Sequence, residues 1–179
     1  MRRKEFIDII LNSISDKFDI YHNYWFENKK FVIYAYNYSY DHKLSSDEVR
    51  LNLPKSYEHL FFVNCDNLGV NEFNKLYNFA VNKIEPHFVR GDNKLPAKNH
   101  MFSYISFIII TRNQPSDEVC NMIKNCNWSK GYLFNARGYC NIRMVCVTPS
   151  KYNVISNKYG TAISDFLMEL MLHMEHYED

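Results

Sequence analysis

The sequence predicts an α+β fold, with about four helices packed on a mainly antiparallel sheet of about five to six strands. Apolar residues recur at helical spacing in separate segments, and strand-like segments follow one another directly in two places. Consecutive strands without an intervening helix favour antiparallel pairing, with helices covering the sheet. The 179 residues are the usual size of one domain, so we expect a single domain over residues 1–179 with a single layer-on-layer core.

Four amphipathic segments predict the helices. Apolar side chains such as Phe6, Ile10 and Ile14 recur every three or four residues in the first of them. Pro86 predicts the end of the second, because the residue before a proline disfavours the helical conformation. The four segments are 3–17, 70–85, 115–127 and 160–176.

The strands are predicted from runs of aromatic and β-branched residues. The first two form a hairpin around residues 27–30, and the polar stretches 41–57 and 90–99 are expected to be loops. Tyr34, Tyr36, Tyr38 and Tyr40 alternate along the second strand and share one face, opposite Phe31, Ile33 and Ala35. The predicted strands are 18–26, 31–40, 58–65, 102–111, 132–136 and 139–148, with a short edge strand at 152–156.

Charge and cysteine usage restrict the function classes. The formal net charge is +1, from 21 basic and 20 acidic residues, whereas duplex-binding domains have a clear basic excess, so there is no strong nucleic-acid signal. Five cysteines without a CxxC pair are typical of a reducing compartment. The charged start and the lack of a long apolar run predict neither a signal peptide nor a membrane span, and we expect a cytoplasmic protein.

Several short elements from about residue 85 onward also occur in one known family. They are Pro86-His87, His100-Met101-Phe102-Ser103-Tyr104-Ile105, Ser129-Lys130-Gly131-Tyr132, Gly138 and Asn157-Lys158-Tyr159-Gly160, with Phe18-Asp19-Ile20 and Tyr34-Ala35-Tyr36 fitting more loosely. Through them the chain resembles a prokaryotic family of small proteins that is a domain of unknown function. The resemblance implies one domain and carries no activity, cofactor or partner. Here the loop at 90–99 separates the Pro-His and His-Met elements, which argues against joint action of His87 and His100.

Basic residues of the same half form a candidate anion site. Arg143 is the most informative, because a charge within a strand must face solvent, pair or meet a ligand. Its planar guanidinium suits a carboxylate or phosphate, although the wet face of an antiparallel sheet explains it more simply. The candidate ligand-binding residues are Arg143, Lys130, His100, Arg137 and Lys158.

A weaker metal candidate lies on the last predicted helix. Glu169, His173 and His176 share a face with Asp165, and imidazole with carboxylate suits zinc or nickel. A solvated helix face is the more economical interpretation. We expect no cofactor, because the five glycines are far apart and form no phosphate-binding loop.

Three functions remain open. The preferred one is a non-catalytic binding or interaction module that recognises an unknown protein partner or a small anionic ligand, with a homodimer formed through the tyrosine-bearing face. The first alternative is a metal-dependent enzyme acting on phosphate esters or nucleic acid, since the order of elements is similar to restriction-endonuclease-like folds. That chemistry would use Asp41 and Glu58, but Leu60 stands where its lysine belongs. The second alternative is a small-anion sensor using Arg143 and Lys130.

Overall fold

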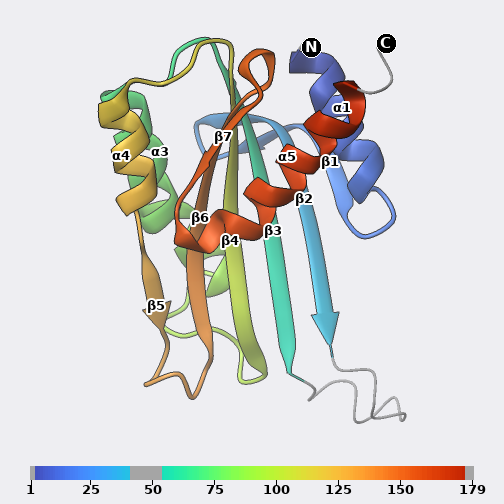
Figure 1. Cartoon of the computed structure of the whole chain (residues 1–179). Coiled ribbons are helices and arrows are strands. Elements are labelled where there is room, and N and C mark those ends of the chain that lie inside the picture. Colours follow the sequence, from blue (N-terminus) through green and yellow to red (C-terminus); the bar gives the residue numbers. More distant parts are fainter. Residues whose placement is uncertain (1–2, 41–53, 176–179) are drawn as a thin grey trace.

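The chain folds around one mixed sheet with helices on both faces (Figure 1). The structure, a computed structural model, describes residues 3–40 and 54–175. The strands are β1 (Asp19–Phe26), β2 (Lys29–Tyr40), β3 (Lys55–Cys65), β4 (His100–Thr111), β5 (Ser129–Gly131), β6 (Tyr139–Thr148) and β7 (Asn153–Ser156). The helices are α1 (Arg3–Ile14), α3 (Val70–Phe79), the π-helical η1 (Ala80–Val89), α4 (Asp117–Asn125), the short 3₁₀ turns η2 (Pro149–Lys151) and η3 (Lys158–Gly160), and α5 (Thr161–Glu175).

The α+β class and the four α-helices are as predicted, while the sheet differs in two respects. Over the described residues it has seven strands in the order β1-β2-β3-β4-β6-β5, and β7 also pairs with β6. Most neighbours are antiparallel, but β3 with β4 and β4 with β6 are parallel. Between β3 and β4, α3 and η1 return the chain along the sheet, and a helical crossover of this kind allows parallel pairing.

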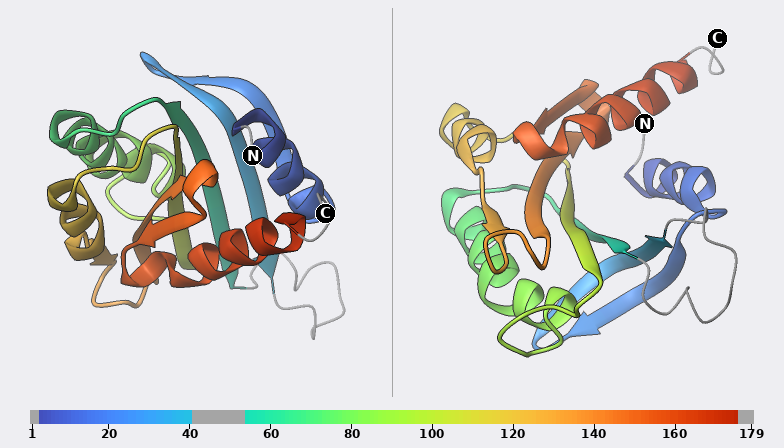
Figure 2. Two further views of the ribbon diagram at one scale, coloured as in Figure 1. Left: turned by 45° about the horizontal axis from the view of Figure 1, so that its top comes forward. Right: turned by 90° about the horizontal axis from the view of Figure 1, so that it is seen from below.

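The apolar residues form two clusters, one on each face of the sheet. The first lies under α3, η1 and α4 and includes Phe61, Phe107 and Met144. The second lies under α1 and α5 and includes Phe62, Ile108 and Val145. Figure 2 shows α3 and α4 on one side of the sheet and α1 and α5 on the other. The arrangement therefore has three layers, and the predicted single layer-on-layer core is wrong because central strands are buried on both faces.

Three local predictions are corrected. The second helix continues past Pro86 to Val89, because the chain widens into the π-helical η1, where the missing proline N–H does not end the helix. The predicted strand at 132–136 is a turn, since Leu133, Phe134 and Asn135 all have positive φ angles, between 51° and 67°. Phe31 packs in the same cluster as Tyr34 rather than opposite it. The hairpin is distorted at this point, because Asn23 has a φ of 52°. His22 pairs with Ile33 and Tyr24 with Phe31, but Asn23 between them has no paired residue on β2.

Two elements from the family resemblance have structural roles in the described chain. Gly138 begins the return into β6 with a φ of 72°, and a Cβ atom there would collide with the Met101 carbonyl oxygen. The Asn157 side chain accepts hydrogen bonds from the backbone N–H groups of Met144 and Gly160 and donates to the Ile142 carbonyl. It thereby joins β6 to the start of α5.

Candidate ligand-binding site

A pocket opens on the sheet face that carries α1 and α5. It encloses about 470 Å³ between the two helices and the sheet, and we call it the α1–α5 pocket. In Figure 1 the two helices cross the upper part of this face, while the ends of β2, β3 and β4 below α5 carry no helix. Its lining residues are Ile10, Ser13, Ile14, Lys17, Phe18, Asn37, Ser39, Ser56, Glu58, Leu60, Phe102, Ile108, Arg143, Ala162, Ile163 and Phe166.

The strand register brings the polar side chains of the pocket together. Glu58 on β3 lies between Asn37 of β2 and Tyr104 of β4, and Arg143 of β6 pairs with Ser106 of β4. Alternation along each strand directs these side chains to the α1 and α5 face, because their neighbours one residue away pack in the opposite cluster. The polar floor is therefore a product of four strands that are adjacent only in the folded chain.

Arg143 lies at the centre of this floor and is 14% exposed. Its guanidinium carbon is 3.5 Å from the centroid of the Tyr104 ring, and its Nη1 is 3.5 Å from Glu58 Oε1. That ion pair is long and engages one nitrogen only. The Arg143 Nε is buried and has no hydrogen-bond partner. The residue is thus held in place by the aromatic ring while part of its donor capacity stays unused.

Two neighbouring buried groups on this face also lack partners. Ser106 Oγ is fully buried across the ladder from Arg143, and Asn141 Oδ1 lies two residues before Arg143 on β6. A buried polar atom without a hydrogen bond destabilises the folded state by about 1–3 kcal/mol. Of the three residues that carry these unpaired atoms, Arg143 lines the pocket, whereas Ser106 and Asn141 are its neighbours in the sheet and do not line the pocket.

The walls of the pocket differ in polarity. Ile10, Ile14 and Phe18 line the α1 side, and Ile163 and Phe166 line the α5 side. The polar groups are confined to the floor formed by the strands, apart from Ser13 and the exposed Lys17 at the rim. A pocket with apolar walls and a few converging polar groups is typical of small-molecule sites.

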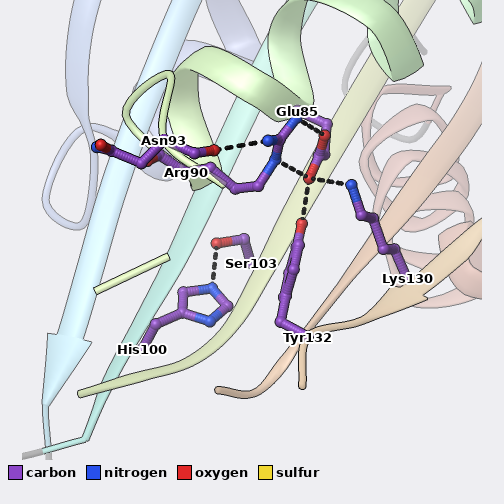
Figure 3. A network of polar contacts seen from close by, with 7 residues as sticks. All are labelled: Glu85, Arg90, Asn93, His100, Ser103, Lys130 and Tyr132. Carbon is purple, nitrogen blue, oxygen red and sulfur yellow. Dashed lines mark hydrogen bonds and ion pairs between the residues drawn. The ribbon is translucent and has the colours of Figure 1, made fainter. Parts of the chain in front are cut away.

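A second polar cluster lies on the opposite face and is drawn in Figure 3. The Glu85 carboxylate is 1% exposed and accepts hydrogen bonds from Arg90 Nε at 2.9 Å and Arg90 Nη2 at 3.1 Å. Lys130 Nζ at 3.1 Å and the Tyr132 hydroxyl at 2.5 Å complete its contacts. Burial alone would raise the pKa of Glu85, but these donors lower it below its usual value. Burial raises the pKa of Tyr132, so this hydroxyl stays protonated and donates.

The same side of the sheet holds His100 in a closed set of contacts. His100 Nε2 is 2.9 Å from Ser103 Oγ, and Nδ1 is 2.8 Å from the Arg137 carbonyl oxygen. Burial lowers the pKa of His100, which favours the neutral ring. His87 makes a separate contact, with its Nδ1 2.7 Å from Asp92 Oδ2, so the structure gives the two histidines different partners.

The five predicted ligand-binding residues do not converge. Arg143 lies in the α1–α5 pocket, whereas Lys130 and His100 lie in the contacts of the opposite face. Arg137 donates from Nη1 to the Pro96 carbonyl at 3.1 Å, and Lys158 lies over the ring of Tyr159. Arg143 is therefore the member of the set that combines a pocket with unused donor capacity.

The metal candidates remain dispersed in the described part of the chain. Glu169 and His173 are exposed on α5, while His176 and Asp41 lie outside the described residues. Among residues 3–40 and 54–175, no three His, Cys, Asp or Glu side chains gather closely enough to hold a metal ion. Glu58 does line a pocket, and its neighbour on the same strand face is the apolar Leu60.

The tyrosine row of β2 lies on the face opposite the pocket, and its described members become more exposed from Tyr34 to Tyr38. Tyr34 is 7% exposed, and its hydroxyl is 2.9 Å from His59 Nδ1. Tyr36 is half-buried and stacks on Tyr57, whereas Tyr38 is 49% exposed. The homodimer through this row stays a prediction. No described helix has the length and apolar character that a membrane span requires.

Sequence reasoning missed several members of the pocket. It did not assign a role in the pocket to the lining residues of α1, nor to Ser106 and Tyr104, which lie next to Arg143 without lining the pocket. One signal was present: Ser106 interrupts the apolar run of β4, and Asn141 and Arg143 are polar on one side of β6. The parallel pairing of β4 with β6, which brings these residues together, was not visible in the sequence.

Comparison with known proteins identifies the family. No curated protein and no solved structure matches the chain. A family model described as Domain of unknown function (DUF8052) matches residues 2–169, in agreement with the resemblance to a family without assigned activity. By this match over almost its whole length, the chain belongs to that family.

Proposed function

We propose that this protein is a non-catalytic binding module that holds a small ligand with an anionic group in the α1–α5 pocket, with Arg143 as the residue that contacts that group. The carrying observation is that Arg143, a partly buried cation, lines a pocket of about 470 Å³ and is held there by a single long ion pair. A guanidinium presents paired donors that match a carboxylate or phosphate, and here they are positioned before the ligand arrives.

The surroundings support recognition of one end of the ligand and burial of the rest. Tyr104 fixes the plane of the Arg143 guanidinium, so little side-chain entropy is lost on binding. The apolar walls from α1 and α5 suit a hydrocarbon portion. The cysteines of the described chain are all free, which supports a reducing compartment such as the cytoplasm.

Hydrolysis of phosphate esters or nucleic acid is the competing function. Metal-assisted cleavage uses carboxylates that converge on a hard cation, together with a general base or water-activating group. The described lining of the pocket contains a single carboxylate, Glu58, and Arg143 already contacts it. This arrangement supports binding over catalysis.

Calorimetry and thermal-shift assays test the proposal with the full chain. We expect carboxylates with an apolar tail, such as 4-methylpentanoate or 3-phenylpropanoate, or the matching amino acids, to raise the melting temperature, because binding to the folded state alone stabilises it. Arg143→Met should weaken the affinity at least about tenfold, the effect of losing one charged hydrogen bond. Arg112→Met is the matched control, since Arg112 is 66% exposed and pairs with Asp66 outside the pocket. Binding that Arg143→Met leaves intact, or no binding by any of these compounds or inorganic phosphate, would overturn the proposal.

A further inference from the structure

We infer that the ligand of the α1–α5 pocket is a zwitterion, an α-amino acid with an apolar side chain, whose carboxylate binds Arg143 and whose ammonium group binds Glu58. The inference rests on the proposed function and narrows its ligand class. Its basis is that the polar floor offers both signs of charge side by side, with Arg143 Nη1 3.5 Å from Glu58 Oε1.

The presence of Glu58 disfavours a simple anion. An anionic group on the Arg143 guanidinium would lie close to the Glu58 carboxylate, and the repulsion would offset much of the attraction. A simple cation at Glu58 would meet the guanidinium in the same way. An α-amino acid carries its two charges one carbon apart, so each faces its opposite and the net charge of the site is unchanged.

Both charged side chains line the pocket and stay partly exposed, Glu58 at 34% and Arg143 at 14%, so a ligand in the pocket can contact both. The ammonium group of an amino acid only donates hydrogen bonds and its carboxylate only accepts them, which matches Glu58 and Arg143 respectively.

The walls of the pocket indicate that the side chain of this ligand is apolar. Leu60 and Ile108 continue the floor, and Ile14, Phe18, Ile163 and Phe166 close the sides. These surfaces are branched and aromatic, and no charged group lies among them except Lys17, which is exposed at the rim. An aliphatic or aromatic side chain would bury its surface there, at about 25 cal/mol per Å² of apolar area removed from water.

Matched compounds separate this inference from the proposed function. Isothermal titration calorimetry of the full chain would compare L-leucine with 4-methylpentanoate and 3-methylbutylamine, which lack the ammonium and the carboxylate respectively. The corresponding set for an aromatic side chain is L-phenylalanine, 3-phenylpropanoate and 2-phenylethylamine. We expect at least one amino acid to bind about tenfold or more tightly than both of its analogues, since each analogue leaves one charge of the site unpaired.

Glu58→Gln provides the decisive variant. It keeps the shape of the side chain and removes its charge, so the amino acid should lose affinity while the matching carboxylate gains it, and the preference should reverse. Arg112→Met should leave both affinities unchanged, and a denaturation curve of each variant would check that it is folded. If the carboxylate binds wild-type protein as well as the amino acid does, this inference fails and the proposed function stands. If no compound in either set binds, both fail.

Discussion

Each face of the sheet holds an ion pair between an arginine and a glutamate, and the two pairs differ in how completely they are hydrogen-bonded. On one face Glu85 accepts two hydrogen bonds from Arg90, and Lys130 and Tyr132 complete its shell (Figure 3). On the other face Arg143 and Glu58 meet across 3.5 Å through one nitrogen, and Arg143 Nε is left over. We call the Glu85 pair closed, because four hydrogen bonds surround its carboxylate, and the Arg143–Glu58 pair open, because it has a single long contact.

This difference distinguishes a structural ion pair from a recognition site better than burial does. The Glu85 contacts connect η1 with the strand β5 and the turn that follows it, so they hold together two segments that are distant in sequence. The Arg143 contacts connect β6 to β4 and, across β4, to β3, and backbone hydrogen bonds already hold these strands in one sheet. We therefore expect the open pair to add little to the fold.

The largest expected effect on stability comes from removing the negative charge of Glu85. Glu85→Gln should lower the free energy of unfolding by about 3–5 kcal/mol, because the positive charges of Arg90 and Lys130 lose their buried partner. Glu58→Gln is the matched control and should cost less than about 1 kcal/mol, since its single ion pair is long and the side chain is 34% exposed. Urea denaturation at neutral pH measures both. Equal costs would show that the two pairs do not differ as described.

Acid should destabilise the folded protein through protonation of the buried His59. Burial lowers the pKa of His59 to about 3, from an ordinary value of 6.5, so the unfolded chain binds a proton that the folded chain excludes. The contribution is fully present above pH 6.5 and is lost as the pH falls toward 3, by about 2 kcal/mol between pH 6.5 and 4.5. Denaturation curves across this range would show the loss.

A double variant isolates the His59 contribution. The combination of Tyr34→Phe and His59→Phe removes both members of the buried hydrogen bond. The free energy of unfolding of this variant should then depend less steeply on pH between 6.5 and 4.5. An unchanged slope between pH 6.5 and 4.5 would assign the acid sensitivity to other groups. Glu85 contributes mainly below this range, because its hydrogen-bond donors lower its pKa and the resulting stabilisation is lost as the pH falls below the ordinary value of 4.5.

Local patterns predicted most of the elements. The periodicity of residues such as Phe6 and Ile10 located α1, and the polar residues before Val119 located the start of α4, where Ser116 caps the helix. The turn at 132–136 was missed, because residues such as Leu133 and Phe134 have the composition of a strand and Phe134 is nonetheless fully exposed. Local composition does not reveal a left-handed turn when the residues are not glycine.

Pairing between distant strands was the part that sequence could not supply. Arg143 was singled out because a charge within a strand requires an explanation. Lys130 and His100 were grouped with it because they lie in the half of the chain that carries the family resemblance, and the structure places them on the other face. Which residues share a site depended on the parallel pairing of β3, β4 and β6, which the crossovers through α3 and η1 and through α4 allow.

Replacing the arginine of each ion pair, Arg143 or Arg90, compares the two pairs a second time. Arg143→Met should change the unfolding free energy by less than about 1 kcal/mol, because replacing a buried charge by an apolar side chain is often neutral when its partner can reach water. Arg90→Met should cost about 3 kcal/mol, since Glu85 is 1% exposed and cannot be hydrated. Thermal and urea denaturation of the two variants would measure the difference. A large loss in Arg143→Met would mean that this arginine supports the fold rather than a ligand.

The smallest effect concerns one oxygen atom. Ser106→Ala removes a buried hydroxyl that has no partner, so the protein without ligand should keep its stability or gain up to about 1 kcal/mol. Thr111→Ala is the control on the same strand, because the Thr111 hydroxyl contacts Thr148 Oγ1 at 2.7 Å and its loss should destabilise by about 1 kcal/mol. A destabilised Ser106→Ala would show that the hydroxyl is satisfied in solution, for example by water.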